Sequence, residues 1–222
     1  METRKFTALV FGSSGLVGKN IVSQLLTNPH FEKVILFNRK SSTIRHPKIT
    51  EHLIHFNDEK NLKEQIHGDI LFCCLGSTIK KAGSKEAFQE IDLVYPERIA
   101  QLASANGVKS FLLISSVGAN AHSENFYLQT KGKCENAIRK FPFAHYLIFR
   151  PSLLIGKRNE FRPGEAIAQF LMPKIKFLFF GRIKKYAPVK AELLASFMIH
   201  SSLTCQKSYE IFENDEINSF VG

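Results

Sequence analysis

The sequence predicts an α/β fold in which a doubly wound parallel sheet is covered by helices on both faces. Apolar runs rich in β-branched and aromatic residues alternate with segments whose length and apolar spacing suit helices. A glycine-rich turn separates the first such run from the first helical segment. At 222 residues, the chain is long enough for one sizeable core. We therefore expect a single domain over residues 1–222.

Six strands are expected, each a short apolar run bounded by polar or turn residues. They cover residues 6–11, 33–37, 52–56, 70–75, 110–115 and 145–149. The helices expected between them cover residues 18–27, 59–67, 86–106 and 126–140. Right-handed crossovers place the carboxyl ends of such strands along one ligand crevice, so functional residues should gather at strand ends.

The last third of the chain is less regular. Helix-like stretches cover residues 164–171 and 191–202, and an acidic stretch covers residues 213–216. No linker rich in Pro, Gly or Ser marks a domain boundary. Residues 151–222 are therefore expected to add a small C-terminal cap to the same domain.

The glycine-rich turn reads Gly-Ser-Ser-Gly-Leu-Val-Gly over residues 12–18, directly after the first strand. A pyrophosphate needs bare backbone close by and N–H groups that point at it from a helix N-terminus, and glycines at this spacing supply both. We therefore predict a dinucleotide-binding Rossmann fold; a purely structural strand-to-helix turn is the alternative. The cofactor contacts expected here are Gly12, Ser14, Gly15, Leu16, Val17 and Gly18.

The end of the second strand predicts which dinucleotide binds. An NAD site usually has Asp or Glu here for the ribose 2′-hydroxyl, whereas this chain has Arg39 and Lys40. The planar guanidinium of Arg39 can hold a 2′-phosphate and Lys40 adds a second charge, so we expect NADP(H). The alternative is a pair of solvated loop charges. After the fourth strand, Leu75 and Gly76 bring a further glycine to the crevice.

Tyr127 and Lys131 are predicted to form a catalytic pair. They stand four residues apart on one face of an expected helix, where the ammonium can favour the phenolate and lower the tyrosine pKa from about 10. Such a tyrosine can exchange a proton with a carbonyl or an alcohol. The spacing also recurs by chance, but here it follows Ser115 and Ser116 at the fifth strand, and one of these hydroxyls could hydrogen-bond the reacting oxygen.

Together these motifs resemble the short-chain dehydrogenase/reductase superfamily, in particular its atypical, compact branch that includes the human Tat-interacting, tumour-suppressor-like proteins. The resemblance spans nearly the whole chain. It also includes residues 72–78 (FCCLGST), 81–83 (KAG), 149–151 (FRP) and 162–165 (RPGE). It implies that Tyr127 is the acid/base, that Lys131 binds the ribose hydroxyls and tunes the tyrosine, and that Ser116 is the better match for the serine, with Ser115 possible. The cofactor contacts that it implies beyond the glycine-rich turn are Arg39, Lys40, Leu75, Gly76, Tyr127, Lys131, Leu154 and Arg162.

The chain departs from this resemblance in two places. Many active relatives have an asparagine in the helix after the fourth strand, which completes a proton relay, whereas this chain has Asp92. The region after Gly156 is too short for the sugar-nucleotide domain of extended epimerases. A small or unusual substrate is therefore expected.

The net charge of +10 is concentrated in one stretch, because residues 131–190 hold fourteen Lys or Arg and three acids. Such a patch attracts polyanions, but no nucleic-acid-binding module accompanies it, so we expect an anionic cofactor or substrate and no nucleic acid. Residues 170–180 (FLMPKIKFLFF) are too short to span a bilayer. They could make weak membrane-surface contact, close over the nicotinamide or form a subunit contact.

The remaining sequence features exclude other classes. Cys73, Cys74, Cys134 and Cys205 contain no CxxC pair and are expected to be reduced thiols. His52 and His55 lack further ligands at zinc spacing, so no metal is expected. The first residues show no secretory h-region, which predicts a cytoplasmic protein.

These expectations combine into one function and one alternative. The function is NADP(H)-dependent hydride transfer to or from a small carbonyl or alcohol, with Tyr127 as acid/base and Ser116 at the substrate oxygen. The alternative is a regulatory or scaffold protein that binds NADPH without turning it over, since fold alone does not establish catalysis.

Overall fold

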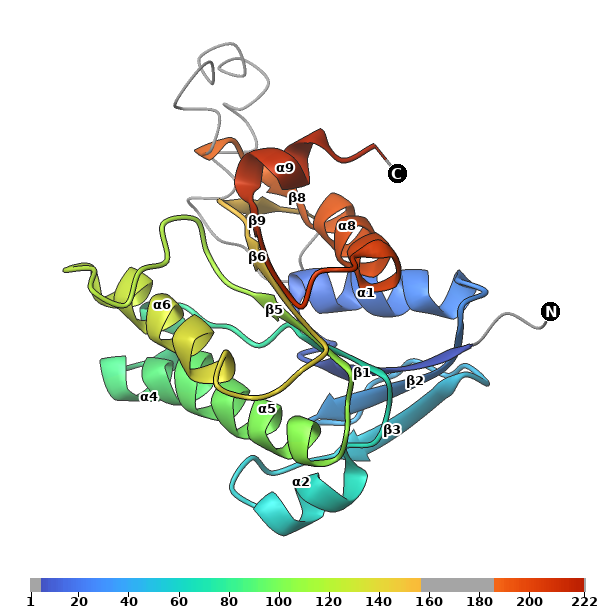
Figure 1. The fold of residues 1–222 in the computed structure, drawn as a ribbon. Helices are drawn as coiled ribbons and strands as arrows, with labels where there is room; N and C mark the ends of the chain where they lie inside the picture. Colours follow the sequence, from blue (N-terminus) through green and yellow to red (C-terminus); the bar gives the residue numbers. More distant parts are fainter. Residues whose placement is uncertain (1–4, 157–185, 222) are drawn as a thin grey trace.

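A computed structural model of the chain describes residues 5–156 and 186–221 (Figure 1). Seven strands form the main sheet in the order β3-β2-β1-β4-β5-β6-β9. Every neighbouring pair is parallel. The strands are β1 (Phe6–Phe11), β2 (Phe31–Asn38), β3 (Ile49–Leu53), β4 (Ile70–Cys73), β5 (Ser110–Ile114), β6 (His145–Arg150) and β9 (Tyr209–Glu213). The doubly wound α/β fold is confirmed.

Helices cover both faces of this sheet (Figure 1). One face carries α1 (Leu16–Thr27), α8 (Ala191–Thr204) and α9 (Asn214–Ser219), and the other carries α2 (Glu59–Gln65), α5 (Tyr95–Ala105) and α6 (Phe126–Ile138). The short helices α3 (Ile79–Ala82) and α4 (Lys85–Gln89) and a π-helical turn, η1 (Glu90–Val94), lie between β4 and α5. A second sheet pairs β7 (Leu154–Ile155) with β8 (Val189–Lys190).

Each face of the sheet has its own hydrophobic core. Along β1, Ala8 and Val10 belong to the core under α1 and α8, whereas Leu9 and Phe11 belong to the core under α2, α5 and α6. Successive side chains of a strand point to opposite faces, so a strand covered on both sides must be apolar throughout. This explains why the central strands read as continuous apolar runs.

The third strand lies earlier than the sequence predicts. Residues Ile49–Leu53, not residues 52–56, pair with Val34–Asn38 of β2. Ile54 and Phe56, which made the later run look like a strand, are buried in the loop that follows β3. The apolar side chains of Ile54 and Phe56 correctly indicated burial, but the strand is defined by its pairing with β2.

The single helix expected over residues 86–106 consists of α4, η1 and α5 in direct succession. The π-helical turn in its middle adds a residue to the turn and shifts the side chains that follow, which is common at functional sites. Its buried residue is Asp92.

The C-terminal part adds a seventh strand that the sequence analysis missed. Tyr209–Glu213 pairs with β6 at the sheet edge, and the expected acidic stretch is the junction of β9 and α9. Helix α8 packs against α1, where Gln24 Nε2 donates to the Glu192 carbonyl at 3.2 Å. Residues 191–219 therefore belong to the layers of the main sheet. The single-domain division and the cap stay predictions.

Some expectations fall outside the described residues. These are the helix over residues 164–171, the aromatic and basic run over residues 170–180, and the cofactor contact Arg162. Among the helices that the structure does describe, none has the length and apolarity needed to cross a bilayer.

Candidate active site

The glycine-rich turn joins β1 to α1 through two very close backbone approaches. Gly12 has φ of +81°, and a Cβ on it would lie 2.6 Å from the carbonyl oxygen of Cys74. A Cβ on Gly18 would lie 2.2 Å from the carbonyl oxygen of Gly12. Only glycine fits at either position. No side chain caps α1 at Gly15, so its first N–H groups are left for an anion, as a dinucleotide pyrophosphate requires.

A cavity of about 650 Å³ opens at the carboxyl ends of β1, β4 and β5. It brings together most of the residues that the sequence predicted from distant parts of the chain. Its predicted lining residues are Ser14, Gly15, Leu16, Val17, Leu75, Gly76, Ser115, Ser116, Tyr127, Lys131 and Leu154. It is the candidate for a catalytic site and is called the catalytic cavity below. Gly12 and Gly18 do not line it and instead shape the turn beneath it.

A second cavity, of about 750 Å³, is lined by Arg39 and Lys40. Ser14 lines both cavities, so the two adjoin at the glycine-rich turn. The stacked rings of Phe56 and Tyr95, with centroids 4.2 Å apart, form an aromatic side of the second cavity. The combination of two cations with an aromatic surface suits the adenosine end of a phosphorylated dinucleotide.

Asn38 stands at the end of β2, next to the two cations. Its Oδ1 accepts a hydrogen bond from Ser13 Oγ at 2.6 Å, and its Nδ2 donates to Glu51 at 2.7 Å. Glu51 also accepts from the Ser42 backbone N–H at 2.8 Å. Slight burial would raise the pKa of Glu51, but these hydrogen bonds lower it. Glu51 therefore stays ionised and fixes the loop that carries Arg39 and Lys40.

Tyr127 and Lys131 lie one turn apart on α6 and line the same cavity. The ring of Tyr127 stacks on Phe88, with centroids 5.4 Å apart. Lys131 is buried, and its Nζ lies 2.8 Å from Oδ1 of Asp92. Burial alone would lower the pKa of the Lys131 ammonium, but the charge of Asp92, the neighbouring Tyr127 and the hydrogen bond to Asp92 together outweigh burial, so the pKa is raised. The lysine is therefore a permanent cation.

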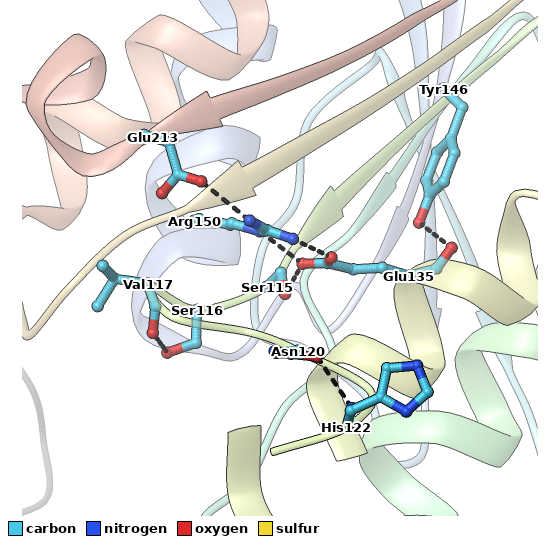
Figure 2. A network of polar contacts seen from close by, with 9 residues as sticks. All are labelled: Ser115, Ser116, Val117, Asn120, His122, Glu135, Tyr146, Arg150 and Glu213. Carbon is cyan, nitrogen blue, oxygen red and sulfur yellow. Dashed lines mark hydrogen bonds and ion pairs between the residues drawn. The ribbon is translucent and has the colours of Figure 1, made fainter. Parts of the chain in front are cut away.

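The two serines after β5 have different partners (Figure 2). Ser115 is buried and donates to Oε1 of Glu135 at 2.5 Å. Among the residues that the structure describes, the hydroxyl of Ser116 reaches only the neighbouring Val117 carbonyl, at 3.4 Å, and it is half-buried in the cavity lining. This favours Ser116 over Ser115 as the serine at the substrate oxygen. Its catalytic role stays a prediction, as does cofactor binding by each predicted contact.

Glu135 is the centre of a buried ionic network that the sequence analysis missed (Figure 2). Its carboxylate binds Arg150 of β6, with Arg150 Nη2 at 2.6 Å and Nε at 3.0 Å. Arg150 also binds Glu213 of β9 at 2.9 Å. A signal was present in the sequence, because Glu135 continues the row of every fourth residue that starts at Tyr127 and Lys131.

The cysteines and histidines form no second site in the described ranges. All four cysteines are free thiols, and burial raises the pKa of Cys73 to about 12, which leaves it unreactive. No three side chains of His, Cys, Asp or Glu come together there as metal ligands would.

The chain is similar to two groups of characterised relatives. Protein HTATIP2 of Rattus norvegicus is 35% identical over 167 residues, which cover 73% of this chain and 69% of that protein. The protein "FMP52, mitochondrial" of Candida albicans is 32% identical over 169 residues, which cover 73% of this chain and 74% of that protein.

The expected cytoplasmic location is contradicted by these fungal relatives, because they are named as mitochondrial proteins. The expectation rested on the lack of a secretory h-region. That segment directs secretion only, whereas import into mitochondria uses amphipathic, Arg-rich segments, so its absence did not exclude mitochondria.

Solved structures show the same fold. The Bordetella bronchiseptica enzyme WbmH in complex with NAD+ aligns with a TM-score of 0.70 at 16% identity, over 94% of this chain and 75% of that one. A UDP-N-acetylglucosamine 4-epimerase from Methanobrevibacter ruminantium aligns with a TM-score of 0.71 at 17% identity, over 95% and 77%. A family profile described as NAD(P)H-binding matches residues 12–169. The chain therefore belongs to the NAD(P)H-binding family that this profile describes, and HTATIP2 and FMP52 are its relatives.

Proposed function

We propose that this protein is an NADPH-dependent oxidoreductase that transfers hydride to or from a small carbonyl or alcohol substrate. The observation that carries the proposal is the catalytic cavity, which joins the glycine-rich turn to Ser116, Tyr127 and Lys131. The adjoining cavity with Arg39 and Lys40 supports the choice of the phosphorylated cofactor. The names of the fungal relatives support a mitochondrial location.

The residues of the two cavities would bind different parts of the cofactor. The N-terminus of α1 and the glycine-rich turn would hold the pyrophosphate, and Arg39 and Lys40 would hold the 2′-phosphate. When bound, the nicotinamide cofactor supplies or accepts the hydride. Lys131 would bind the ribose hydroxyls.

The substrate oxygen would be handled by two hydroxyls. Tyr127 gives its phenolic proton to a carbonyl oxygen, or takes one from an alcohol, and the fixed charge of Lys131 favours the phenolate that remains. Ser116 donates a hydrogen bond to the same oxygen and stabilises the negative charge that develops there. Apolar Leu153 and Leu154 line the cavity beside them and favour a substrate with an apolar part.

The cofactor preference is tested by titrating the protein with NADPH and with NADH. Replacing Arg39 by Ala removes charge-assisted hydrogen bonds to the 2′-phosphate, so NADPH affinity should fall about 10- to 100-fold while NADH affinity is nearly unchanged. Arg45→Ala is the matched control. Arg45 is an exposed cation of the same loop that lines neither cavity, and it donates to the backbone carbonyls of Ser42 and Ile44.

Either result is informative. Equal loss in both variants would assign the effect to net charge and not to a 2′-phosphate site. If the unmodified protein binds neither nucleotide at physiological concentrations, the oxidoreductase proposal fails and the chain is a Rossmann scaffold.

The second candidate function is an NADPH-binding regulator without turnover. The observation that favours it is Asp92, which replaces the relay asparagine of many active relatives and balances the positive charge of Lys131. The two functions differ in one measurement. An oxidoreductase consumes NADPH with some member of a panel of small aldehydes and ketones, whereas a regulator binds NADPH and consumes none.

A further inference from the structure

Asp92 links two sides of the catalytic cavity through its two carboxylate oxygens. The side chain is fully buried on the π-helical turn η1. Oδ1 lies 2.8 Å from Lys131 Nζ on α6, and Oδ2 accepts the backbone N–H of Ser77 at 2.8 Å. Ser77 follows Leu75 and Gly76 in the loop after β4, so one carboxylate fixes both the lysine and this loop.

Apart from Asp92, few groups around Lys131 stabilise the positive charge of its ammonium. Its side chain is 7% exposed, and its other hydrogen bond, to the Ile114 carbonyl, is 3.5 Å long. The titratable groups around it are Tyr127 and Cys134 on α6 and Cys73 on β4. Burial raises the pKa of both thiols, so they stay neutral.

The other nearby carboxylate is committed elsewhere. Glu135 lies one turn beyond Lys131 on α6, but its oxygens bind Ser115 and Arg150. A buried ammonium without an adjacent carboxylate would favour the neutral amine. Within the part of the chain that the structure describes, Asp92 is the carboxylate that contacts Lys131.

We propose that Asp92 is a positioning residue that keeps Lys131 charged and holds the loop at Leu75–Ser77 against α6 before the cofactor binds. The inference rests on the proposed function for its meaning, but the geometry at Asp92 can be tested without any cofactor. An asparagine at this position could still accept the Ser77 N–H, yet it would not balance the ammonium. Asp92→Asn therefore separates the hydrogen bond to Ser77 from the charge balance of Lys131.

The first test follows the protonation of Lys131 in the protein without ligand. Lysines are labelled with ¹³C, and the signal of Lys131 is identified by its absence in Lys131→Met. In Asp92→Asn the midpoint of the Lys131 titration should fall to about pH 8–9, whereas in the unmodified protein it should stay above about pH 10. Glu90→Gln, an exposed change on the same turn, should leave it in place. An unchanged midpoint in Asp92→Asn overturns the proposal.

A thermodynamic cycle decides the matter if the single variant folds poorly. When Asp92 acts through Lys131, Asp92→Asn lowers the melting temperature of the unmodified protein but does not lower it in the Lys131→Met background, where Asp92 is an unpaired buried carboxylate. An equal loss in both backgrounds would show that Asp92 acts through general packing and would overturn the proposal.

The second test measures NADPH affinity between about pH 6.5 and 9.5, a range in which the 2′-phosphate, with a pKa near 6, is largely ionised. Affinity of the unmodified protein should be nearly constant. That of Asp92→Asn should weaken about tenfold across the range as Lys131 loses its proton. An equal loss of NADPH affinity at every pH would contradict the role of Asp92 in keeping Lys131 charged. If the unmodified protein binds no NADPH, the proposed function fails, whereas the titration of Lys131 still decides the role of Asp92.

Discussion

Lys131, which is buried beside the catalytic cavity, and the partly buried Arg150 are each met by a carboxylate from another element. Lys131 of α6 binds Asp92 of η1, and Arg150 of β6 binds Glu135 of α6. The pKa of Arg150 is raised mainly by its hydrogen bond to Glu135. Removal of Asp92 would leave Lys131 uncompensated, and removal of Glu135 would leave Arg150 with the exposed Glu213; losing a buried carboxylate in this way costs more than the pair itself contributes. The fixed positions of Lys131 and Ser115 depend on Asp92 and Glu135.

At the level of single residues, Tyr127→Phe is the sharpest test of the chemistry. Loss of a general acid/base lowers turnover about 10²- to 10⁴-fold. The ring still stacks on Phe88, so the fold and NADPH affinity should change little. The measurement is NADPH oxidation with the best carbonyl substrate, beside an NADPH titration of the same preparation.

Tyr186→Phe serves as the control for this prediction, because Tyr186 lines the same cavity without belonging to the predicted pair. It should keep most of the turnover. Tyr127 would not be the proton donor if its phenylalanine variant kept full activity or if Tyr186→Phe lost more.

Residues of the site could be predicted from the sequence where a short motif identifies them. Gly12 and Gly18 follow from the turn, and Tyr127 and Lys131 follow from a four-residue spacing on one helix. The partner of Lys131 could not be predicted, because Asp92 reaches it only through the π-helical turn η1. A charged residue in a helical segment is usually solvated, and nothing local marks this one as buried.

At the level of elements, the network of Glu135, Arg150 and Glu213 ties α6 to β6 and to the edge strand β9 (Figure 2). Glu135→Gln removes the buried charge that faces Arg150 and should lower the free energy of unfolding by about 3 kcal/mol. Urea denaturation measures this change. Because Ser115 donates to Glu135, the same variant should also loosen the serine loop beside the cavity.

The matched control for Glu135→Gln is Glu213→Gln. Glu213 is 42% exposed in its side chain, so water screens its bond to Arg150 and the loss should be about 1 kcal/mol or less. Equal losses in the two variants would mean that the network contributes as a surface ion pair and not as a buried one.

The sequence predicted the central strands better than the edges, for a physical reason. Strands β1, β4 and β5 are covered on both faces, so their apolar runs are continuous. The edge strand Tyr209–Glu213 is only partly buried and includes two glutamates, one of which pairs with Arg150. Such a strand has no continuous apolar run, and only its pairing with β6 defines it. The strands of the second sheet have two residues each, too few to show any period.

At the level of the whole molecule, the catalytic cavity lies where the strand order reverses between β1 and β4, and the second cavity adjoins it at the ends of β2 and β3. Loops that leave β1 and β4 toward opposite faces open a crevice there, which is where doubly wound sheets bind ligands. The glycine-rich turn, the loop after β2 and the loop after β4 contribute to it. Sequence could predict this crevice because topology fixes it, whereas the substrate depends on residues that no motif identifies.

A cofactor that spans both cavities should stabilise the folded protein, because the unfolded chain lacks the site. At about one hundred times its Kd, NADPH adds about 2.7 kcal/mol to the free energy of unfolding. For a domain of this size that corresponds to a rise in melting temperature of about 5–10 °C. NADH at the same concentration should give a smaller rise, since it offers no 2′-phosphate to Arg39 and Lys40. In Arg39→Ala the rise with NADPH should fall to the level seen with NADH. Equal rises for both nucleotides in the unmodified protein would show that the second cavity does not distinguish them.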